Sequence, residues 1–344
     1  MKVNYLIIKA QDVIYFMSSP KFKHLQEFGG GGVRDIRIKF PYIAALRPRQ
    51  WTKNLVVFAA PLFAFSIDWQ SFLASSLAFA CFCCVSGTFY LLNDILDVES
   101  DRQHPVKCKR PIAAGLVSIP VALAMAAVLF SSAIVSGWLV APNLGTVLIS
   151  YAILQVAYNL KLKRTVILDI VAIAIGFMLR ASAGAAATSL PMSPWFLMCT
   201  AMLALFLGIE KRKAELRLSG IKNIKPRSVL KRYSLPLLTR MESMVSTGAV
   251  MSYALWSSGP SLKGASTSWM LLTLPFVIYG IFRYQLLSDS KEIIRRSGNR
   301  LEHGGKTERP EEVLLKDLPI MGTVLSWIVT CFAILWLKNQ GIIE

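Results

Sequence analysis

The sequence predicts an all-α, polytopic membrane protein, folded as a bundle of about nine transmembrane helices. Hydrophobic residues make up 54% of the 344-residue chain and charged residues only 17%, whereas an ordinary soluble domain carries about 25% charged residues. Long apolar runs recur along the chain, and basic residues gather in alternate connections between them. These features exclude a soluble or disordered protein, and six cysteines are too few for a disulfide-stapled scaffold.

Nine apolar runs approach the length of about 20 residues that a helix needs to cross the hydrocarbon core. In chain order they cover residues 54–68, 70–93, 117–140, 143–160, 165–187, 193–209, 242–258, 268–288 and 318–337. The first follows the basic Lys53, the second ends at the acidic Asp94, and the short connection Ala141–Asn143 separates the third from the fourth. The sixth ends at a charged run that begins with Glu210, and the ninth follows the charged loop 289–317.

The basic residues orient these spans. Of the 38 Lys and Arg residues, Lys263 and Lys338 lie in segments predicted to face outward, and Arg180 and Arg283 lie within spans. All the others fall in segments that face inward when the N-terminus is cytoplasmic, as the positive-inside rule requires. This asymmetry accounts for the net charge of +18 without a nucleic-acid partner, and it places water-phase chemistry on the cytoplasmic side.

Residues 1–40 are predicted to form a peripheral N-terminal arm. Lys9, Gln11 and Asp12 interrupt its apolar stretch, which therefore lacks the continuous core of a signal peptide. The run Gly29–Gly32 is typical of a flexible linker. We therefore expect a single transmembrane domain over residues 41–344.

The most informative segment runs from Asn93 to Asp101, directly after the second apolar run. If the helix continues, Asp94, Asp97 and Asp101 fall within about 60° of one another, with Asn93 beside them. Three carboxylates on one face repel one another unless a cation neutralises them. Because Mg²⁺ prefers oxygen ligands, we expect these four residues to bind Mg²⁺, and a solvated acidic helix end is the alternative.

Basic residues follow this segment closely, at Lys107, Lys109 and Arg110, and three others that precede it in the chain, Arg47, Arg49 and Lys53, open the first span. Lys and Arg supply counter-charges for phosphate oxygens, and Arg grips two oxygens at once. A metal beside such cations predicts a polyphosphorylated ligand. The three residues that precede the segment lie at the membrane interface, where they bind either a lipid phosphate or anionic headgroups.

These motifs resemble those of the UbiA superfamily of intramembrane prenyltransferases. The pattern from Asn93 to Asp101 is similar to its first aspartate-rich motif, and the likeness extends from Pro41 to the last span. Within the superfamily, the segments Leu46–Asn54, His104–Gly115 and Tyr158–Lys163, followed by Asp169, most resemble decaprenyl-phosphate phosphoribosyltransferases.

The resemblance implies a helical bundle around a cavity that opens to the cytoplasm, in the inner membrane of a bacterium. It implies an Mg²⁺-dependent enzyme of cell-envelope biosynthesis that moves 5-phosphoribose from phosphoribosyl diphosphate to a polyprenyl phosphate and releases pyrophosphate. Homo-oligomerisation is left open. Catalytic roles are expected for Asp94, Asp97, Asp101, Lys161 and Asp169. Substrate binding is expected of Arg47, Arg49, Lys53, Asn93, Lys107, Lys109, Arg110, Tyr158, Lys163, Arg180, Lys211 and Arg212.

The sequence departs from the superfamily after the sixth span. A prenyltransferase of this kind usually has a second aspartate-rich motif there, but this region reads Glu210–Arg217, and no aspartate lies between Asp169 and Asp289. Cations in place of carboxylates bind phosphate directly, which disfavours ordinary prenyl transfer. Prenyl transfer to an aromatic acceptor remains the alternative, and a transporter is a third class, disfavoured because the charges gather at one membrane face.

Four further residues are the subject of separate expectations. Asp169 lies near the start of the fifth span, where a buried carboxylate requires a cation partner. Arg180 lies deeper in that span and is interpreted as functional, with pairing to a buried acid such as Glu242 as the structural alternative. Tyr158 and Lys161 are expected to share one helical face.

Overall fold

The computed structural model describes residues 40–66, 68–104, 107–222, 229–289 and 317–344. The chain divides into two compact units. The first unit contains the described residues of Met1–Arg49 and Gly87–Val128, and the second contains those of Gln50–Ser86 and Leu129–Glu344. The arm predicted for residues 1–40 lies, apart from Phe40, outside the described residues.

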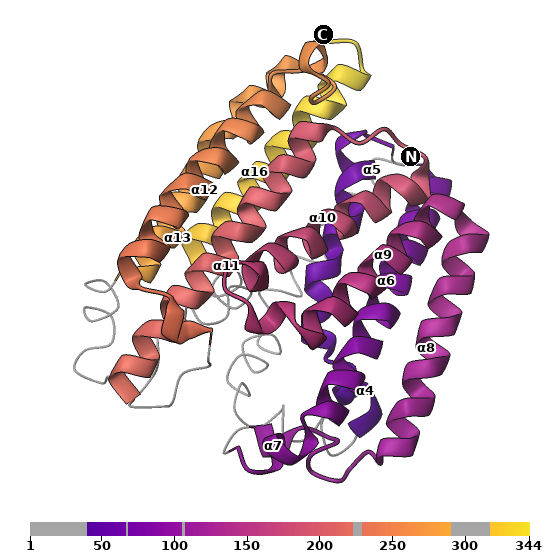
Figure 1. The fold of residues 1–344 in the computed structure, drawn as a ribbon. Coiled ribbons are helices and arrows are strands. Elements are labelled where there is room, and N and C mark those ends of the chain that lie inside the picture. Colours follow the sequence, from indigo (N-terminus) through magenta and orange to yellow (C-terminus); the bar gives the residue numbers. More distant parts are fainter. Residues whose placement is uncertain (1–39, 67, 105–106, 223–228, 290–316) are drawn as a thin grey trace, which may run out of the picture. The chain divides into compact units, whose positions relative to one another are not determined.

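The first unit centres on the C-terminal end of helix α6 (Trp69–Leu96). Its other elements, marked in Figure 1, are α4 (Pro41–Ala45), α7 (Val98–Arg102), the 3-10 turn η2 (Lys107–Lys109) and the N-terminal part of α8 (Ile119–Val140). A Cβ added at Gly87 would lie 3.3 Å from Leu46 Cδ2, so the chain after α4 passes close to α6. Arg47 follows with a φ of 55°, and this turn directs its side chain to the end of α6.

The helix that precedes the acidic segment does not continue through it. Helix α6 ends at Leu96, Asp97 has φ −95° and ψ 7°, and α7 begins at Val98. Asp and Ser favour turns and helix caps over helix interiors because their short side chains bond to nearby backbone groups. Ser100 Oγ does so here, donating to the Asp97 carbonyl at 2.9 Å. The expected single acidic face is therefore divided at Asp97.

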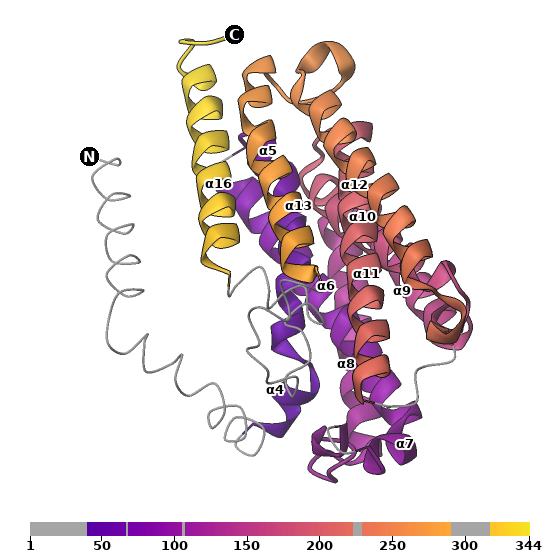
Figure 2. The same cartoon turned by 90° about the vertical axis from the view of Figure 1, so that its left-hand side faces the viewer.

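The second unit is built from long helices. Its elements are η1 (Pro48–Phe58), α5 (Ala59–Phe63), the N-terminal part of α6, the C-terminal part of α8, α9 (Pro142–Leu160), η3 (Leu162–Arg164), α10 (Leu168–Thr188), α11 (Pro194–Lys222), η4 (Leu230–Arg232), α12 (Leu235–Ser257), η5 (Pro260–Leu262), η6 (Ser268–Thr273), α13 (Leu274–Ser288) and α16 (Leu318–Asn339). Figures 1 and 2 both show α11 beside α12 and α13 beside α16, and α10 packs between α9 and α11.

Two apolar clusters hold the second unit together. Toward the N-terminal half of α12, Leu238 and Val245 pack with Ile170, Phe206 and Ile281. Toward its C-terminal end, a mostly aromatic cluster includes Phe63, Tyr253, Trp256, Trp327 and Met270, and the Phe63 and Trp256 rings meet edge to face at 4.8 Å. These clusters fix α10, α11 and α12 against one another, and the polar ends of the helices take their positions from this packing.

Six helices of the described residues are long and apolar enough to cross a membrane: Trp69–Leu96, Ile119–Val140, Leu168–Thr188, Pro194–Arg217, Ser268–Ser288 and Leu318–Asn339. They confirm a multi-pass membrane protein but not the predicted number of nine. The run predicted at 54–68 forms the 3-10 helix η1 followed by the short α5, and not one continuous helix. Helices α9 and α12 are long, but polar residues such as Gln155, Arg240 and Glu242 lower their mean hydropathy.

The closest backbone approach in the second unit yields a stability prediction. A Cβ at Gly184 of α10 would lie 1.8 Å from the carbonyl oxygen of Val57 in η1, whereas one at Gly280 of α13 would meet nothing within 4 Å. Gly184→Ala should therefore destabilise the protein by about 3 kcal/mol or more, because a backbone atom must move. Gly280→Ala should be neutral or stabilising by up to about 1 kcal/mol. Thermal unfolding in detergent measures both, and equal midpoints would contradict the packing of α10 on η1.

Candidate active site

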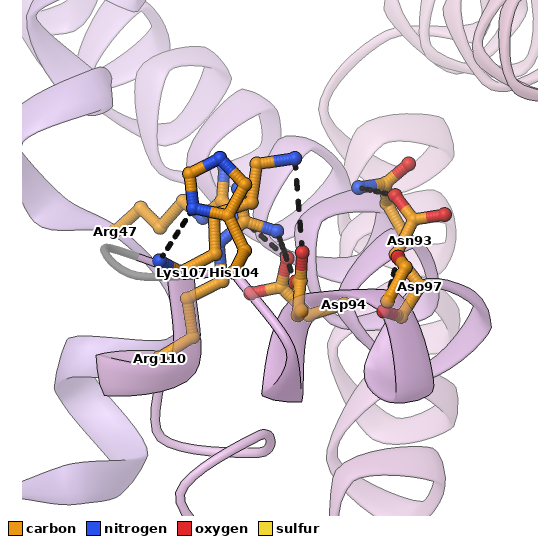
Figure 3. A network of polar contacts seen from close by, with 9 residues as sticks. Arg47, Asn93, Asp94, Asp97, His104, Lys107 and Arg110 are labelled. Carbon is orange, nitrogen blue, oxygen red and sulfur yellow. Dashed lines mark hydrogen bonds and ion pairs between the residues drawn. The ribbon is translucent and has the colours of Figure 1, made fainter. Parts of the chain in front are cut away.

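A compact network of charges lies at the end of α6 in the first unit. Asp94 and Asp101 are 3% and 0% exposed, and both bind the guanidinium of Arg110. Arg110 Nη1 lies 3.0 Å from Asp94 Oδ1, and Arg47 Nη2 donates to the same oxygen at 2.5 Å. Figure 3 shows Arg47 and Arg110 converging on Asp94, with Lys107 beside them. Two carboxylates on different helices, Asp94 in α6 and Asp101 in α7, thus bind the same arginine.

Positive charge exceeds negative charge in this network. Lys107 Nζ lies 3.8 Å from Asp101 Oδ1, which makes three cations around two carboxylates. Burial of two carboxylates is costly unless cations and hydrogen bonds compensate them, and the arginines supply that compensation. Lys107 and the outer parts of both guanidiniums are partly exposed. The surplus charge therefore faces the surface, where it can bind an anion such as a phosphate.

Asn93 and Asp97 form a separate pair. Asn93 Nδ2 donates to Asp97 Oδ2 at 3.2 Å, and in Figure 3 the two side chains lie to one side of the Arg47, Asp94 and Arg110 group. The break at Asp97 is the cause, because it turns this carboxylate away from Asp94 and Asp101. Asp97 is half-buried and accepts this bond from a neutral amide, whereas Asp94 is bound by two arginines.

The donor atoms of these four residues fit Mg²⁺ by chemistry. Carboxylate and amide oxygens are its preferred protein ligands, and Asp101 Oδ1 is a buried oxygen with no hydrogen-bond partner. Their present arrangement is two pairs: in the described part of the chain, no group of three or more His, Cys, Asp or Glu side chains is placed to hold a metal ion. Magnesium binding by Asn93, Asp94, Asp97 and Asp101 therefore stays a prediction.

The remaining basic residues of the flanking segments stand outside this network. Arg49 and Lys109 are exposed on the first unit. Lys53 lies half-buried in η1 of the second unit. Substrate binding by these three residues stays a prediction.

A second network lies at the start of α10 in the second unit. Asp169 is fully buried, and Arg212 Nε of α11 donates to its Oδ2 at 2.8 Å. Arg212 Nη1 also donates to Glu215 Oε2 at 2.6 Å. The cation partner expected for Asp169 is therefore Arg212, a residue assigned to substrate binding on sequence grounds. Tyr233, which no sequence motif indicated, donates its hydroxyl to Asp169 Oδ1 at 2.8 Å.

Lys161 and Lys163 lie on the turn just before this network. Helix α9 ends at Leu160, and Lys161 has a non-helical φ of −134°, so Tyr158 and Lys161 do not continue one helix as expected. Lys161 is exposed, and Lys163 and Tyr158 are half-buried. The turn η3 thus presents lysine side chains near the surface, next to the buried Asp169.

Arg180 is bound by uncharged protein groups. Its guanidinium donates to Asn54 Oδ1 at 2.7 Å, to the Tyr151 hydroxyl at 2.7 Å and to the Gly176 carbonyl at 2.9 Å. It also lies 4.9 Å from the centre of the Tyr151 ring, a cation–π contact. Among the described residues, these contacts place Arg180 in a structural network of η1, α9 and α10. Its predicted role in substrate binding stays a prediction.

Glu242, the alternative partner considered for Arg180, pairs with a different residue. Glu242 of α12 forms an ion pair with Lys213 of α11, whose Nζ also lies 2.8 Å from Glu210 Oε1. All three residues are at most 5% exposed. Lys211, on the same helix, is half-buried and was predicted to bind substrate. The charged run of α11 thus serves partly to neutralise acids between helices, a role that the sequence run alone did not show.

A model of the UbiA prenyltransferase family matches residues 54–297. Decaprenyl-phosphate phosphoribosyltransferase of Mycolicibacterium smegmatis is 37% identical, over 86% of this chain and 92% of its own length. The protein of the same name from Corynebacterium glutamicum is 37% identical, over 83% and 84%. Among solved structures, a UbiA homolog from Archaeoglobus fulgidus bound to GPP and Mg²⁺ superposes with a TM-score of 0.61 at 17% identity, covering 85% of this chain and 98% of the other.

The shared guanidinium of the first network yields a prediction. Arg110→Gln leaves Asp94 and Asp101 buried with less compensation, so the free energy of unfolding should fall by about 3 kcal/mol. Arg102→Gln is the matched control, because Arg102 pairs at 2.9 Å with Glu99 where both side chains are exposed, and such pairs contribute at most about 0.5 kcal/mol. Thermal unfolding in detergent compares the two variants. A loss for Arg102→Gln as large as that for Arg110→Gln would show that the buried network does not stabilise the fold.

Proposed function

Because this chain belongs to the UbiA prenyltransferase family and is a membrane transferase, we propose that it transfers 5-phosphoribose from phosphoribosyl diphosphate to a polyprenyl phosphate of the decaprenyl type. The observation that supports this most strongly is the 36–37% identity, over more than four-fifths of the chain, to relatives named decaprenyl-phosphate phosphoribosyltransferase. The strongly inward-facing distribution of Lys and Arg supports an active site on the cytoplasmic side of a bacterial inner membrane.

The reaction mainly requires neutralisation of the negative charges on its substrates. An oxygen of the polyprenyl phosphate attacks C1 of phosphoribosyl diphosphate, the bond from C1 to the pyrophosphate oxygen breaks, and pyrophosphate leaves. The attacking phosphate is already anionic at neutral pH, so no strong general base is required. The transition state has oxocarbenium character, as in glycoside hydrolysis. Catalysis therefore depends on holding two anions together and on stabilising the departing pyrophosphate.

The first network suits binding of phosphate groups. Arg47, Lys107 and Arg110 provide a net positive charge around Asp94 and Asp101, and the two buried carboxylates fix the guanidiniums in place before any ligand arrives. Such preorganised donors cost little reorganisation when charge develops. An Mg²⁺ ion held by Asn93, Asp94, Asp97 and Asp101 would neutralise negative charge on the pyrophosphate group.

In the second unit, Lys161 and Lys163 lie on the turn before α10, where their positive charges suit a phosphate group. Asp169, paired with Arg212 and Tyr233, keeps that turn attached to α10. Asp169 is therefore assigned to positioning the turn, which refines the catalytic role expected from the sequence.

Prenyl transfer to an aromatic acceptor is the second candidate, because some structural neighbours were solved with GPP or DMAPP and Mg²⁺. Their identity of 17% shows the fold alone. The absence of aspartate between Asp169 and Asp289 disfavours a second metal site for a prenyl diphosphate in the described chain. Parallel incubation of the purified protein with labelled phosphoribosyl diphosphate plus polyprenyl phosphate, and with labelled prenyl diphosphate plus an aromatic acceptor, separates the two. A labelled prenylated aromatic product in the second reaction, with no labelled lipid in the first, would reject our proposal.

The metal assignment yields a variant prediction. Asp97→Asn removes one anionic ligand without disturbing the arginine network, so transfer should fall at least about 100-fold while the unfolding midpoint stays unchanged. Glu99→Gln is the control, because Glu99 is exposed and forms an ion pair with the exposed Arg102. Product formation is measured over a titration of Mg²⁺. Full activity of Asp97→Asn at every Mg²⁺ concentration would exclude the metal role of Asp97.

A further inference from the structure

The hydroxyl group of Tyr233 forms hydrogen bonds with two residues at the N-terminus of α10. The hydroxyl accepts the Ile167 N–H at 2.7 Å and donates to Asp169 Oδ1 at 2.8 Å. The side chain is 5% exposed. Burial is the largest influence that raises the pKa of Tyr233, to about 12, so the phenol remains protonated and keeps both bonds over the physiological range.

Ile167 needs an external restraint. It has φ 72° and ψ −49°, a conformation that a β-branched residue rarely adopts. Strained backbone of this kind persists only where the surroundings hold it. The Ile167 side chain is 50% exposed and provides little packing. The bond from its N–H to Tyr233 is therefore a direct restraint on the strained residue.

The strained residue connects the lysine-bearing turn to α10. Lys161 and Lys163 lie on one side of it, in the turn from the end of α9 through η3, and Asp169 lies on the other side in the first turn of α10. Arg212 holds the second oxygen of Asp169 from α11. Tyr233 thus holds both Ile167 and the first turn of α10, fixing the angle at which the chain enters α10 and with it the direction of the preceding turn.

We propose that Tyr233 is a positioning residue: its hydroxyl holds Ile167 and Asp169 so that Lys161 and Lys163 are oriented toward a phosphate group of the substrate. This inference rests on the proposed phosphoribosyl transfer and deepens it, because it names a residue that acts on substrate phosphate through the lysine turn.

Tyr253 supplies a matched control for the test. It is also 5% exposed, and its hydroxyl also makes two hydrogen bonds, with Thr273 Oγ1 at 2.5 Å and from Trp327 Nε1 at 2.7 Å. It lies toward the C-terminal end of α12, whereas Tyr233 lies just before its N-terminal end. Tyr233→Phe and Tyr253→Phe therefore remove the same atom, with the same number of bonds, from opposite ends of one helix.

Steady-state kinetics of the two variants in detergent or nanodiscs test the proposal. Tyr233→Phe should raise KM for phosphoribosyl diphosphate at least about tenfold with little change in kcat, because lysines that bind phosphate act equally on ground state and transition state. Tyr253→Phe should leave KM within about twofold of wild type. The two unfolding midpoints should be similar. Equal KM values for the two variants would overturn the proposal.

Hydrogen exchange separates this proposal from the proposed function. Tyr233→Phe should accelerate exchange of the amides of residues 161–167, and Tyr253→Phe should not. If wild type and Tyr253→Phe both fail to transfer phosphoribose, the proposed function is wrong, and the exchange result then decides the role of Tyr233 alone. Unchanged exchange of residues 161–167 in Tyr233→Phe would reject that role.

Discussion

Neutralisation of buried carboxylates at the ends of apolar helices is the constraint on which the rest of this structure depends. Asp94, Asp101 and Asp169 are each at most 3% exposed, and each is held by arginine. A buried carboxylate without such a partner would be costly in a membrane protein. The apolar clusters place the helices, and these ion pairs then fix the loops between helices at defined angles.

The same constraint provides a binding surface for anions. Arginine that compensates a buried acid cannot move freely, so its outer N–H groups are fixed in direction. The first unit shows this with the partly exposed Arg47 and Arg110, and Lys107, 3.8 Å from Asp101, adds a third positive charge around two carboxylates. A transferase that must hold two phosphorylated substrates against their mutual repulsion needs arrangements of this kind.

The sequence predicted those features that depend on local pattern. The run at 117–140 forms α8 (Ile119–Val140), and the run at 318–337 forms α16 (Leu318–Asn339), because uninterrupted apolar residues favour helix over that length. The local pattern did not predict the backbone where a few polar residues determine its conformation. The run at 54–68 forms η1 and α5 in place of one helix, and the helix expected to continue through Asp97 ends before it. The local pattern also did not predict hydrogen bonds between residues that are far apart in the sequence. Tyr233 is 64 positions from Asp169 and belongs to no motif, and Asn54, which ends the segment Leu46–Asn54, is 126 positions from Arg180.

Equilibrium binding of phosphoribosyl diphosphate to the purified wild-type protein, measured with and without Mg²⁺, tests the central claim most directly. Fixed cations and oxygen ligands at the end of α6 predict saturable binding of this sugar diphosphate that tightens markedly when Mg²⁺ is present and weakens as salt is added. Binding that is indifferent to Mg²⁺, or a preference for geranyl diphosphate under the same conditions, would contradict the account.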